Sequence, residues 1–443
     1  MSGLVRGIFS FGAYVFLLLF PLIIGALSRH PGQGRGFWVE FAVACGYVGL
    51  AIMAAQFALV SRVQFVAGIF GQDALQHFHK QMGYAVTVFV LAHPMLLFLR
   101  GLPWGMLNPF TLEHHWVWRF GAIGFWGLGL LVCLAAFRKR LKLSYEWWHV
   151  THAIIAAVAL SSALLHVYLV GYDSSRAGMR VLWSLYLLIL FALVVRYRIL
   201  RPLEMWRKPW EVVENITEHG NARTLVLHPI DHHGLRFAPG QFAWLNTGKT
   251  PFHFDQHPIS ISSSAESGAN CQIAFTIKPL GDWSREVVPE IKPGARVWLD
   301  GPYGVLSPDR DQGPGYVMIA GGVGITPLHS MCETLAIRDD CRPIILFYAA
   351  HDYDELIFRE DLEKLQKQMN LKLVYVLEKP NLGWDGEHGR ITAELLRRRL
   401  PRHYKRFQFF ICGPTLLMDA VEQELHKLDV GSEFIHSERF DLV

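Results

Sequence analysis

The sequence has few cysteines and none of the cysteine patterns that mark common metal or disulfide sites. Its 443 residues include six cysteines, and no two of them form a C-x-x-C pair. This absence leaves no evident zinc site and argues against a disulfide framework in a chain of this size. The C-x-x-C-H pattern is absent as well, so any haem would be held without thioether links.

The sequence is also poor in charge. Charged residues make up 18% of the chain, against about 25% in typical soluble proteins. A net charge of +4 is too small to indicate nucleic-acid binding. The deficit lies in the first half, because residues up to about Arg201 are overwhelmingly apolar and aromatic, whereas the remainder reads like a soluble α/β protein. The length allows two or three domains.

Six apolar stretches in the first half approach or reach the roughly 20 residues that cross a bilayer. They lie at residues 8–27, 38–60, 77–99, 117–136, 149–171 and 181–199. The first follows Arg6 and resembles a signal peptide, but its apolar run is long and no clear A-x-A cleavage site follows. We therefore expect a retained first helix and a six-helix membrane bundle.

Basic residues predict how this bundle is oriented. The densest short cluster, residues 138–142, lies between the fourth and fifth stretches, and a second, residues 196–208, follows the sixth. The positive-inside rule assigns both clusters to the cytoplasm. With six spans, both termini are then cytoplasmic, as in a multi-pass protein of a bacterial inner membrane.

Four histidines form two pairs with the same spacing. His79 and His93 lie on the third stretch, His152 and His166 lie on the fifth, and each pair is fourteen residues apart. Along a helix this spacing covers about 21 Å and turns the two rings to within about 40° of one face. Ionisable residues inside membrane helices are functional candidates, and neutral imidazole is a good axial ligand for haem iron.

The predicted orientation pairs these histidines across the two helices. Both helices run outward, so His79 with His152 forms an inner site and His93 with His166 an outer site, each able to hold one haem b. The alternative is that the histidines are hydrogen-bonding groups between helices. Three others are weaker candidates: His149 is one turn before His152, and His114 and His115 lie in an outer loop.

From about Glu211 the pattern changes to short alternating runs and turns, which indicates an antiparallel β-barrel. Beyond Gly315, apolar strands alternate with glycine loops and helical stretches, as in a dinucleotide-binding sheet. We expect a membrane bundle over residues 1–205, the barrel over 206–310 and the α/β domain over 311–443.

Several short motifs in this second half suit cofactor binding. The loop from Gly321 to Pro327 follows a strand and opens a helix, so its N–H groups can receive a pyrophosphate. Upstream, the strand from His257 to Ser263 carries hydroxyl groups that suit the edge of a flavin ring. The candidate residues are His257, Pro258, Ile259, Ser260, Ser262, Ser263, Lys278, Gly301, Gly304, Gly321, Gly322, Gly324, Thr326, Pro327, Gly413 and Pro414.

The order of these motifs resembles the ferredoxin–NADP reductase-like flavoprotein module, and the membrane half resembles a ferric reductase transmembrane domain. Joined, they are similar to the ferric reductase and NADPH oxidase superfamily in a compact bacterial-type form. The resemblance implies two haems on the four histidines, FAD on the barrel, and NADH or NADPH at the glycine loop and at Cys412 to Pro414. It also implies that Cys412 and the near-terminal Phe440 are the catalytic candidates, Phe440 by stacking on the flavin.

The implied function is a transmembrane oxidoreductase that passes electrons from cytosolic NAD(P)H to an outer acceptor. That acceptor is a ferric chelate or O2. Leu97 stands where superoxide-producing relatives have a second histidine, which favours iron. The alternatives are a superoxide-producing oxidase and a haem subunit for a periplasmic reductase partner. The stretch Ala349–Asp352, after the second strand of the sheet, lacks an arginine for a 2′-phosphate. Arg390 could serve instead, which leaves the choice between NADH and NADPH open.

Overall fold

The computed structural model describes residues 3–28, 34–62, 68–111, 115–253, 256–266 and 271–439. The chain divides into two compact units, Met1–Arg201 and Pro202–Val443. Within the described residues, six helices are long and apolar enough to cross a membrane, and all six begin in the first unit. The chain is therefore an integral membrane protein. The expected class, a membrane helical bundle followed by an antiparallel barrel and an α/β domain, is confirmed.

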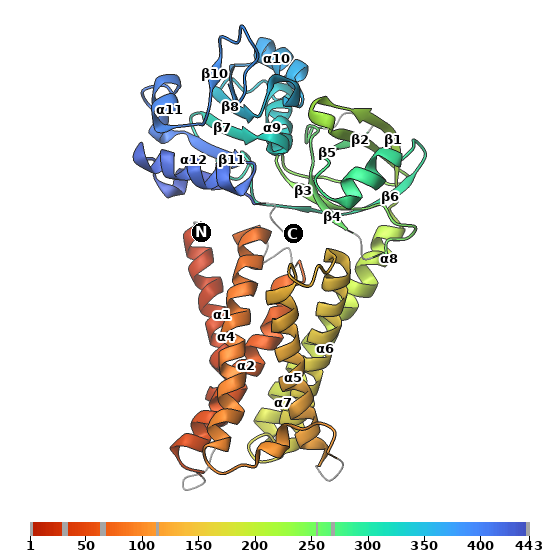
Figure 1. The fold of residues 1–443 in the computed structure, drawn as a ribbon, viewed down its shortest axis with the longest axis vertical. Helices are drawn as coiled ribbons and strands as arrows, with labels where there is room; N and C mark the ends of the chain where they lie inside the picture. Colours follow the sequence, from red (N-terminus) through yellow and green to blue (C-terminus); the bar gives the residue numbers. More distant parts are fainter. Residues whose placement is uncertain are drawn as a thin grey trace. The chain divides into compact units, whose positions relative to one another are not determined.

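The first unit is a bundle of long helices (Figure 1). Pro21 and Pro94 lie inside two of them, which membrane helices tolerate because neighbouring groups satisfy the freed backbone. After the last, a single π turn at Arg196–Leu200 leads into α8 (Arg201–Trp206). The helices are α1 (Gly3–Leu27), α2 (Phe37–Val60), α4 (Gln72–Phe98), α5 (Trp116–Phe137), α6 (Tyr145–Val170) and α7 (Ala177–Val195).

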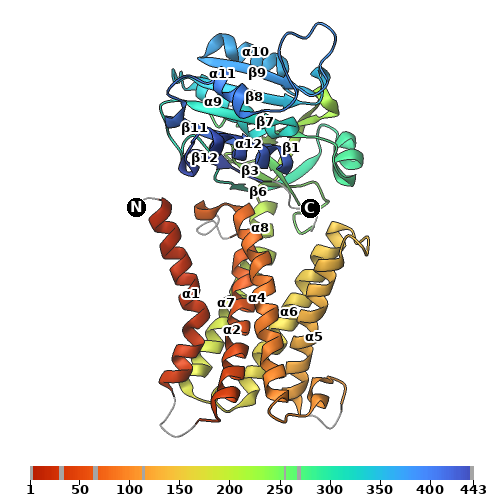
Figure 2. The ribbon, with the colours of Figure 1, turned by 60° about the vertical axis from the view of Figure 1, so that its left-hand side comes forward.

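The helices of the bundle include two closely packed pairs, α2 with α4 and α5 with α6 (Figure 2). Small residues allow the close approach. A Cβ on Gly49 would lie 2.9 Å from Val90, and one on Gly127 would lie 3.0 Å from the Cβ of Ala159. Packing of small residues is the usual way to join helices in a lipid environment, where the hydrophobic effect gives no attraction between them.

The second unit begins with a six-stranded antiparallel sheet. Its strand order is β4-β3-β6-β1-β2-β5. An isolated bridge between Ile261 and Phe275 joins the two ends of the sheet, so the barrel closes. Buried side chains such as Leu225 and Phe275 fill its interior. The strands are β1 (Trp210–Thr217), β2 (Arg223–Pro229), β3 (Phe242–Asn246), β4 (His257–Ser260), β5 (Ile273–Ile277) and β6 (Arg296–Tyr303).

A parallel sheet follows, in the order β10-β9-β8-β7-β11-β12. Its central strand β7 is buried at every residue, because helices cover both faces of the sheet (Figure 1). One apolar core lies under α9 and α10, and the other under α11 and α12. The strands are β7 (Tyr316–Gly321), β8 (Ile344–Ala350), β9 (Leu371–Leu377), β10 (Glu387–His388), β11 (Gln408–Cys412) and β12 (Ile435–Ser437), and the helices are α9 (Ile325–Ile337), α10 (Arg359–Gln368), α11 (Ala393–Arg399) and α12 (Thr415–Lys427).

Candidate functional site

The histidines His93 and His166 are held by the same kind of backbone contact, one in the pair α2 and α4 and the other in the pair α5 and α6. Nδ1 of His93 lies 2.8 Å from the carbonyl oxygen of Ala42, and Nδ1 of His166 lies 2.8 Å from that of Val117. A carbonyl can only accept, so Nδ1 carries the hydrogen and donates it in both rings. Nε2 is then the unprotonated nitrogen, which is the form that binds a metal.

A glycine faces each of these two rings. Gly46 lies four residues after Ala42, and Gly121 lies four residues after Val117. A Cβ on Gly46 would lie 2.8 Å from Nδ1 of His93, and one on Gly121 would lie 2.9 Å from Nδ1 of His166. Any larger residue would push the imidazole away from its carbonyl. The two helix pairs thus repeat one arrangement of carbonyl, glycine and histidine.

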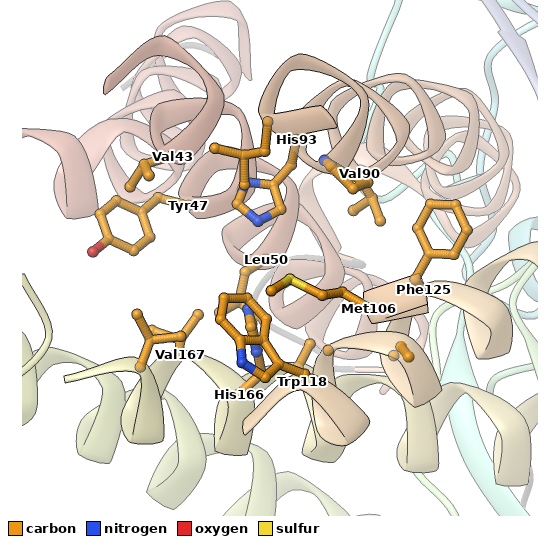
Figure 3. Close-up of a pocket in the computed structure, with 18 of the residues that line it drawn as sticks. Val43, Tyr47, Leu50, Val90, His93, Met106, Trp118, Phe125, His166 and Val167 are labelled. Carbon is orange, nitrogen blue, oxygen red and sulfur yellow. The ribbon is translucent and has the colours of Figure 1, made fainter. Parts of the chain in front are cut away.

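His93 and His166 lie on opposite sides of one cavity and point into it (Figure 3). The space between atoms there is about 1150 Å³, its open mouth included. Its wall is almost entirely apolar. Besides the two histidines, it includes Val43, Tyr47, Leu50, Val90, Leu97, Met106, Trp118, Phe125 and Val167.

Charged residues cross one edge of this cavity. The Arg35 guanidinium lies 2.6 Å from the Asp173 carboxylate and 3.1 Å from that of Glu40, and it stacks over the Tyr172 ring at 4.3 Å. Asp173 is only 2% exposed. These contacts fasten the segment before α2 to the segment after α6, so they fix the edge of the cavity between the two helix pairs.

His79 and His152 face each other, with ring centroids 6.3 Å apart and planes at 62°. Two imidazoles on opposite sides of one metal, each bonded at about 2.0 Å, place their centroids roughly 6 Å apart. Their Nδ1 atoms are buried, and neither has a hydrogen-bond partner within the part of the chain that the structure describes. The donor chemistry and spacing of this pair therefore fit a bis-histidine metal site.

The other histidines are placed less favourably. His77 is exposed, with its Nε2 3.5 Å from the side-chain nitrogen of Gln81. His149 precedes His152 by one turn of α6, and His115 is the residue before α5. His114 lies outside the described residues. The structure thus brings together the two predicted pairs, while the metal role of all four histidines stays a prediction.

In the second unit, the glycine loop lies where the order of the parallel sheet reverses. The chain runs from β7 outward through β8, β9 and β10 and then returns to β11 on the other side of β7, and ligands bind at such a switch point. A Cβ on Gly324 would lie 2.2 Å from the carbonyl oxygen of Cys412, and one on Gly413 would lie 3.0 Å from the amide nitrogen of Gly321. A side chain would therefore clash at Gly324 and crowd Gly413, so the loop and β11 approach each other closely at the start of α9, where an anion can bind.

The remaining predicted residues of this loop are close by. Gly322 has a φ of 54° and starts the 3₁₀ turn Gly322–Gly324. Thr326 is buried and donates its hydroxyl to the Val323 carbonyl at 2.9 Å, and Pro327 lies in the first turn of α9. A Cβ on Gly321 would meet the Pro414 ring at 3.0 Å. The sequence-predicted nucleotide residues therefore form one compact corner.

Cys412 and a carboxylate that the sequence analysis did not select lie beside this corner. Burial, and then the nearby charge of Glu438, raise the pKa of the Cys412 thiol to about 12. Glu438 is itself only 2% exposed, and a Cβ on Gly304 would lie 2.8 Å from its Oε2. Cys412 is thus a neutral thiol at physiological pH. In the sequence, Glu438 could have been noticed as an acidic residue two positions before Phe440. Phe440 itself lies outside the described residues.

The predicted flavin strand uses several of its polar groups inside the protein. Ser260 is 7% exposed on β4, where Pro258 and Ile259 pair with β3. The Ser262 hydroxyl accepts from Thr276 at 3.0 Å, and the Ser263 hydroxyl accepts from the N–H of Ala274 at 3.0 Å. Of the predicted hydroxyl groups, those of Ser262 and Ser263 are therefore already engaged within the barrel.

The same segment joins the barrel to α9 of the parallel sheet. His329 donates from Nδ1 to the Ser262 carbonyl at 2.9 Å, and Ser330 donates to the Ser263 carbonyl at 2.6 Å. One turn later, the Thr334 hydroxyl contacts the Ser264 hydroxyl at 3.2 Å. The flavin strand and the helix that follows the glycine loop are thus fastened together residue by residue.

Three further predicted residues have defined surroundings. The His257 ring stacks on Trp283 at 3.8 Å with planes at 16°. Lys278 forms an ion pair with Glu355 at 2.8 Å, which connects the barrel to the turn after β8. Gly301 packs against β3, where a Cβ would lie 2.8 Å from that of Ala243. Their roles toward a flavin stay predictions.

Three protein-family models match the chain in succession. The "Ferric reductase like transmembrane component" matches residues 45–163, the "FAD-binding domain" matches residues 223–307, and the "Oxidoreductase NAD-binding domain" matches residues 318–423. The first covers parts or all of α2, α4, α5 and α6, and thus includes His79, His93 and His152. The other two are domains of NAD(P)H-dependent flavin oxidoreductases.

The individual relatives named here match only part of this chain. A flavohemoprotein of Oceanobacillus iheyensis is 25% identical over 241 residues, 53% of this chain and 59% of its own length. NADH-cytochrome b5 reductase 1 of Aspergillus terreus is 32% identical over 178 residues, 38% and 58% of the respective lengths. The chain thus spans less than two thirds of these relatives. The FAD/NAD-binding domain of a Vibrio cholerae nitric oxide dioxygenase is a structural neighbour, with 23% identity, 52% and 97% coverage and a TM-score of 0.46.

Proposed function

This chain belongs to the ferric reductase and NADPH oxidase superfamily, and on that premise we propose that it carries electrons across a membrane. The donor is NAD(P)H on the cytoplasmic side, and the acceptor lies on the outer face. The observation that carries the proposal is the repeated arrangement of carbonyl, glycine and histidine around the cavity between His93 and His166. A histidine kept only for packing would not need a glycine opposite its ring in both helix pairs.

We assign two haem b groups to the four histidines. His93 and His166 would hold the outer group, with Nδ1 hydrogen-bonded to backbone and Nε2 directed to the iron. His79 and His152 would hold the inner group across their 6.3 Å gap. The apolar wall of the outer cavity would exclude water from the macrocycle. Bound haems would supply single-electron relay, and bound FAD would accept hydride and release electrons one at a time.

On the soluble side, the residues of the chain position the nucleotide and the flavin. The N–H groups of the Gly321–Gly324 loop and the start of α9 would receive the pyrophosphate of the nucleotide. Cys412, held as a neutral thiol, would present an uncharged surface to a nicotinamide ring. Glu438 is a buried carboxylate whose charge contributes to the raised pKa of Cys412.

The membrane orientation of the proposal rests on the basic residues. The cluster at residues 138–142 follows α5, and the second cluster begins at the end of α7. Both would be cytoplasmic by the positive-inside rule, as in a bacterial inner membrane protein. His79 and His152 would then lie toward the cytoplasm, and His93 and His166 toward the exterior.

For the acceptor we favour a ferric chelate over O2. Leu97 lines the outer cavity, so a polar group that would hold dioxygen is replaced there by an apolar side chain. A periplasmic protein is the third possible acceptor. Reduction of an iron chelate and of cytochrome c should be measured with and without superoxide dismutase. A signal that the dismutase abolishes would contradict direct iron reduction, and a preparation inert toward both would favour a protein partner.

The optical spectrum of the purified full chain tests the proposal as a whole. Before reduction it should show the absorption of flavin and of low-spin haem. After addition of NADH or NADPH under argon, the flavin band should bleach and the reduced haem bands should appear. Protein that stays colourless when expressed with ample haem would contradict the proposal.

A further inference from the structure

An acidic group lies at the end of the strand next to the glycine loop. Asp352 is two residues beyond β8 and begins the turn Tyr353–Glu355. Its Oδ1 accepts hydrogen bonds from the N–H of Asp354 at 3.0 Å and of Glu355 at 3.1 Å. In the described ranges, no group donates to its Oδ2. The carboxylate is therefore held in place by one oxygen, and the other is available to a ligand.

The basic side chains on and against the segment that follows β8 already contact acids. Each has a carboxylate oxygen within 3.1 Å or less, so none offers an uncompensated charge to a phosphate. The ion pairs are Lys278 with Glu355 at 2.8 Å and Arg359 with Glu360 at 2.8 Å, and the His351 ring lies 3.1 Å from the Glu378 carboxylate. The edge of the sheet at β8 is therefore a poor site for a doubly charged anion.

The position of Asp352 in the sheet relates its negative charge to nucleotide recognition. β8 is the neighbour of β7, and β7 leads into the glycine loop. In dinucleotide-binding sheets, an acidic residue near the end of the second strand hydrogen-bonds the ribose 2′-hydroxyl of NAD, whereas a 2′-phosphate needs a cation there. We propose that the chain uses NADH in preference to NADPH and that Asp352 is the residue that determines this preference. The inference rests on the proposed nucleotide site.

Two cations farther along the sheet edge are the rival to this proposal. Lys379 follows β9, and its N–H donates to the His351 carbonyl at 2.8 Å. Arg390 is exposed and follows β10, which is two strands beyond β8. If the chain preferred NADPH, these two residues are the ones that would hold the phosphate.

The first test measures binding without any reaction. Isothermal titration calorimetry on the full chain would compare ADP-ribose with its 2′-phosphorylated form. We expect ADP-ribose to bind about tenfold more tightly or better, because like charges that face each other oppose binding. Asp352→Asn keeps the oxygen that caps the turn but removes the charge, so the preference should shrink to less than about threefold.

Asp354→Asn is the matched control for this variant. It removes the same charge two residues away, from an exposed side chain, and should leave the preference unchanged. Tighter binding of the phosphorylated ligand to the wild type, lost on Lys379→Ala or Arg390→Ala, would overturn the assignment. An unchanged preference in Asp352→Asn would overturn the role of Asp352.

The second test compares the two nucleotides as reductants. Under argon, flavin bleaching should be faster with NADH than with NADPH at equal low concentrations, and Asp352→Asn should reduce that difference. Equal rates, or faster bleaching by NADPH, would overturn the proposed preference. Bleaching by neither nucleotide would instead contradict the proposed function, so the two failures are distinguishable.

Discussion

The two histidine pairs of the membrane unit use the same residue type and the same spacing but different support. The rings of His93 and His166 are each fixed by a backbone carbonyl and faced by a glycine. The rings of His79 and His152 have buried Nδ1 atoms without a partner in the described part of the chain. The comparison teaches that the ligand alone does not define a site, because the groups behind the ligand set its orientation and basicity.

The comparison has an electronic consequence. A hydrogen bond from Nδ1 to a carbonyl makes the imidazole a stronger donor to a metal. We therefore regard the outer pair as the more constrained and more electron-donating of the two. The following predictions either break or sharpen this difference, from the largest expected effect to the smallest.

Removing one pair should remove one haem. The double variant His93→Ala/His166→Ala should lose about half of the haem of the protein, because one of two axial ligand sets is gone. Flavin reduction by NAD(P)H should remain, while outer acceptor reduction should stop. The haem-to-flavin ratio from the pyridine haemochrome spectrum measures the loss. His77→Ala, on the same helix but exposed, is the control, and full haem in the double variant would refute the assignment.

Replacing Gly46 or Gly121 by alanine should weaken haem binding selectively at the outer pair, His93 and His166. In Gly46→Ala or Gly121→Ala the new methyl group meets the histidine ring at 2.8 or 2.9 Å and displaces Nδ1 from its carbonyl. Loss of such a supporting contact typically costs 10- to 100-fold in metal affinity or activity. Haem retention on dilution or competition with apomyoglobin reports the change.

Gly129→Ala serves as the control for this pair of variants. Gly129 lies on α5, as Gly121 does, but nothing lies within 4 Å of its added Cβ. It should retain haem like the wild type. Equal haem loss in the control and in Gly121→Ala would show that any added methyl group disturbs the helix.

The two haems should differ in redox potential. The more strongly donating outer ligands favour the ferric state, so the outer haem should have the lower potential, by about 59 mV for each tenfold change in relative stability of the two oxidation states. A spectroscopic redox titration should resolve two components. Gly121→Ala should shift only the lower one, and a shift of both components would contradict independent support of the two pairs.

The smallest effect is expected at Gln56, beside the inner pair. Its side-chain nitrogen donates to the backbone carbonyl of His79 at 2.9 Å, and Gln56→Leu would remove about 0.5–1.5 kcal/mol of stabilisation. Because this contact acts on the helix and not on the ring, haem content should change little. Thermal unfolding monitored at the haem band measures the effect, and loss of the inner haem would show that Gln56 supports the ring itself.

Sequence reasoning reached the fold class because long apolar runs and alternating strands are local signals. The fourteen-residue spacing of the histidines is equally local, so the pairing of His79 with His152 could be proposed from this spacing and the predicted direction of the two helices. The contacts of Gly46 and Gly121 with the histidine rings could not be predicted from the sequence. Gly46 and His93 meet only after α2 and α4 pack in one particular register, and the sequence shows no periodicity that sets it.

Other differences also follow from nonlocal contacts. The edge strands β10 and β12 have only two and three residues, too short for a pattern, and neighbouring strands hold them in place. Lys278 was named as a cofactor-site candidate, and its ion pair with Glu355, on a distant segment of the chain, could not be read from the sequence. Glu438 was visible in the sequence, but its burial beside Gly304 depends on the folded C-terminal segment.

The bonds between the serine segment and α9 bear on how a reductant reaches the flavin. Hinge-like separation of the barrel from the nucleotide sheet would break the contacts of His329, Ser330 and Thr334 together, each hydrogen bond worth about 1 kcal/mol. These contacts therefore oppose a movement of the barrel away from the nucleotide sheet. The nicotinamide would thus reach the flavin while the barrel and the nucleotide sheet stay joined.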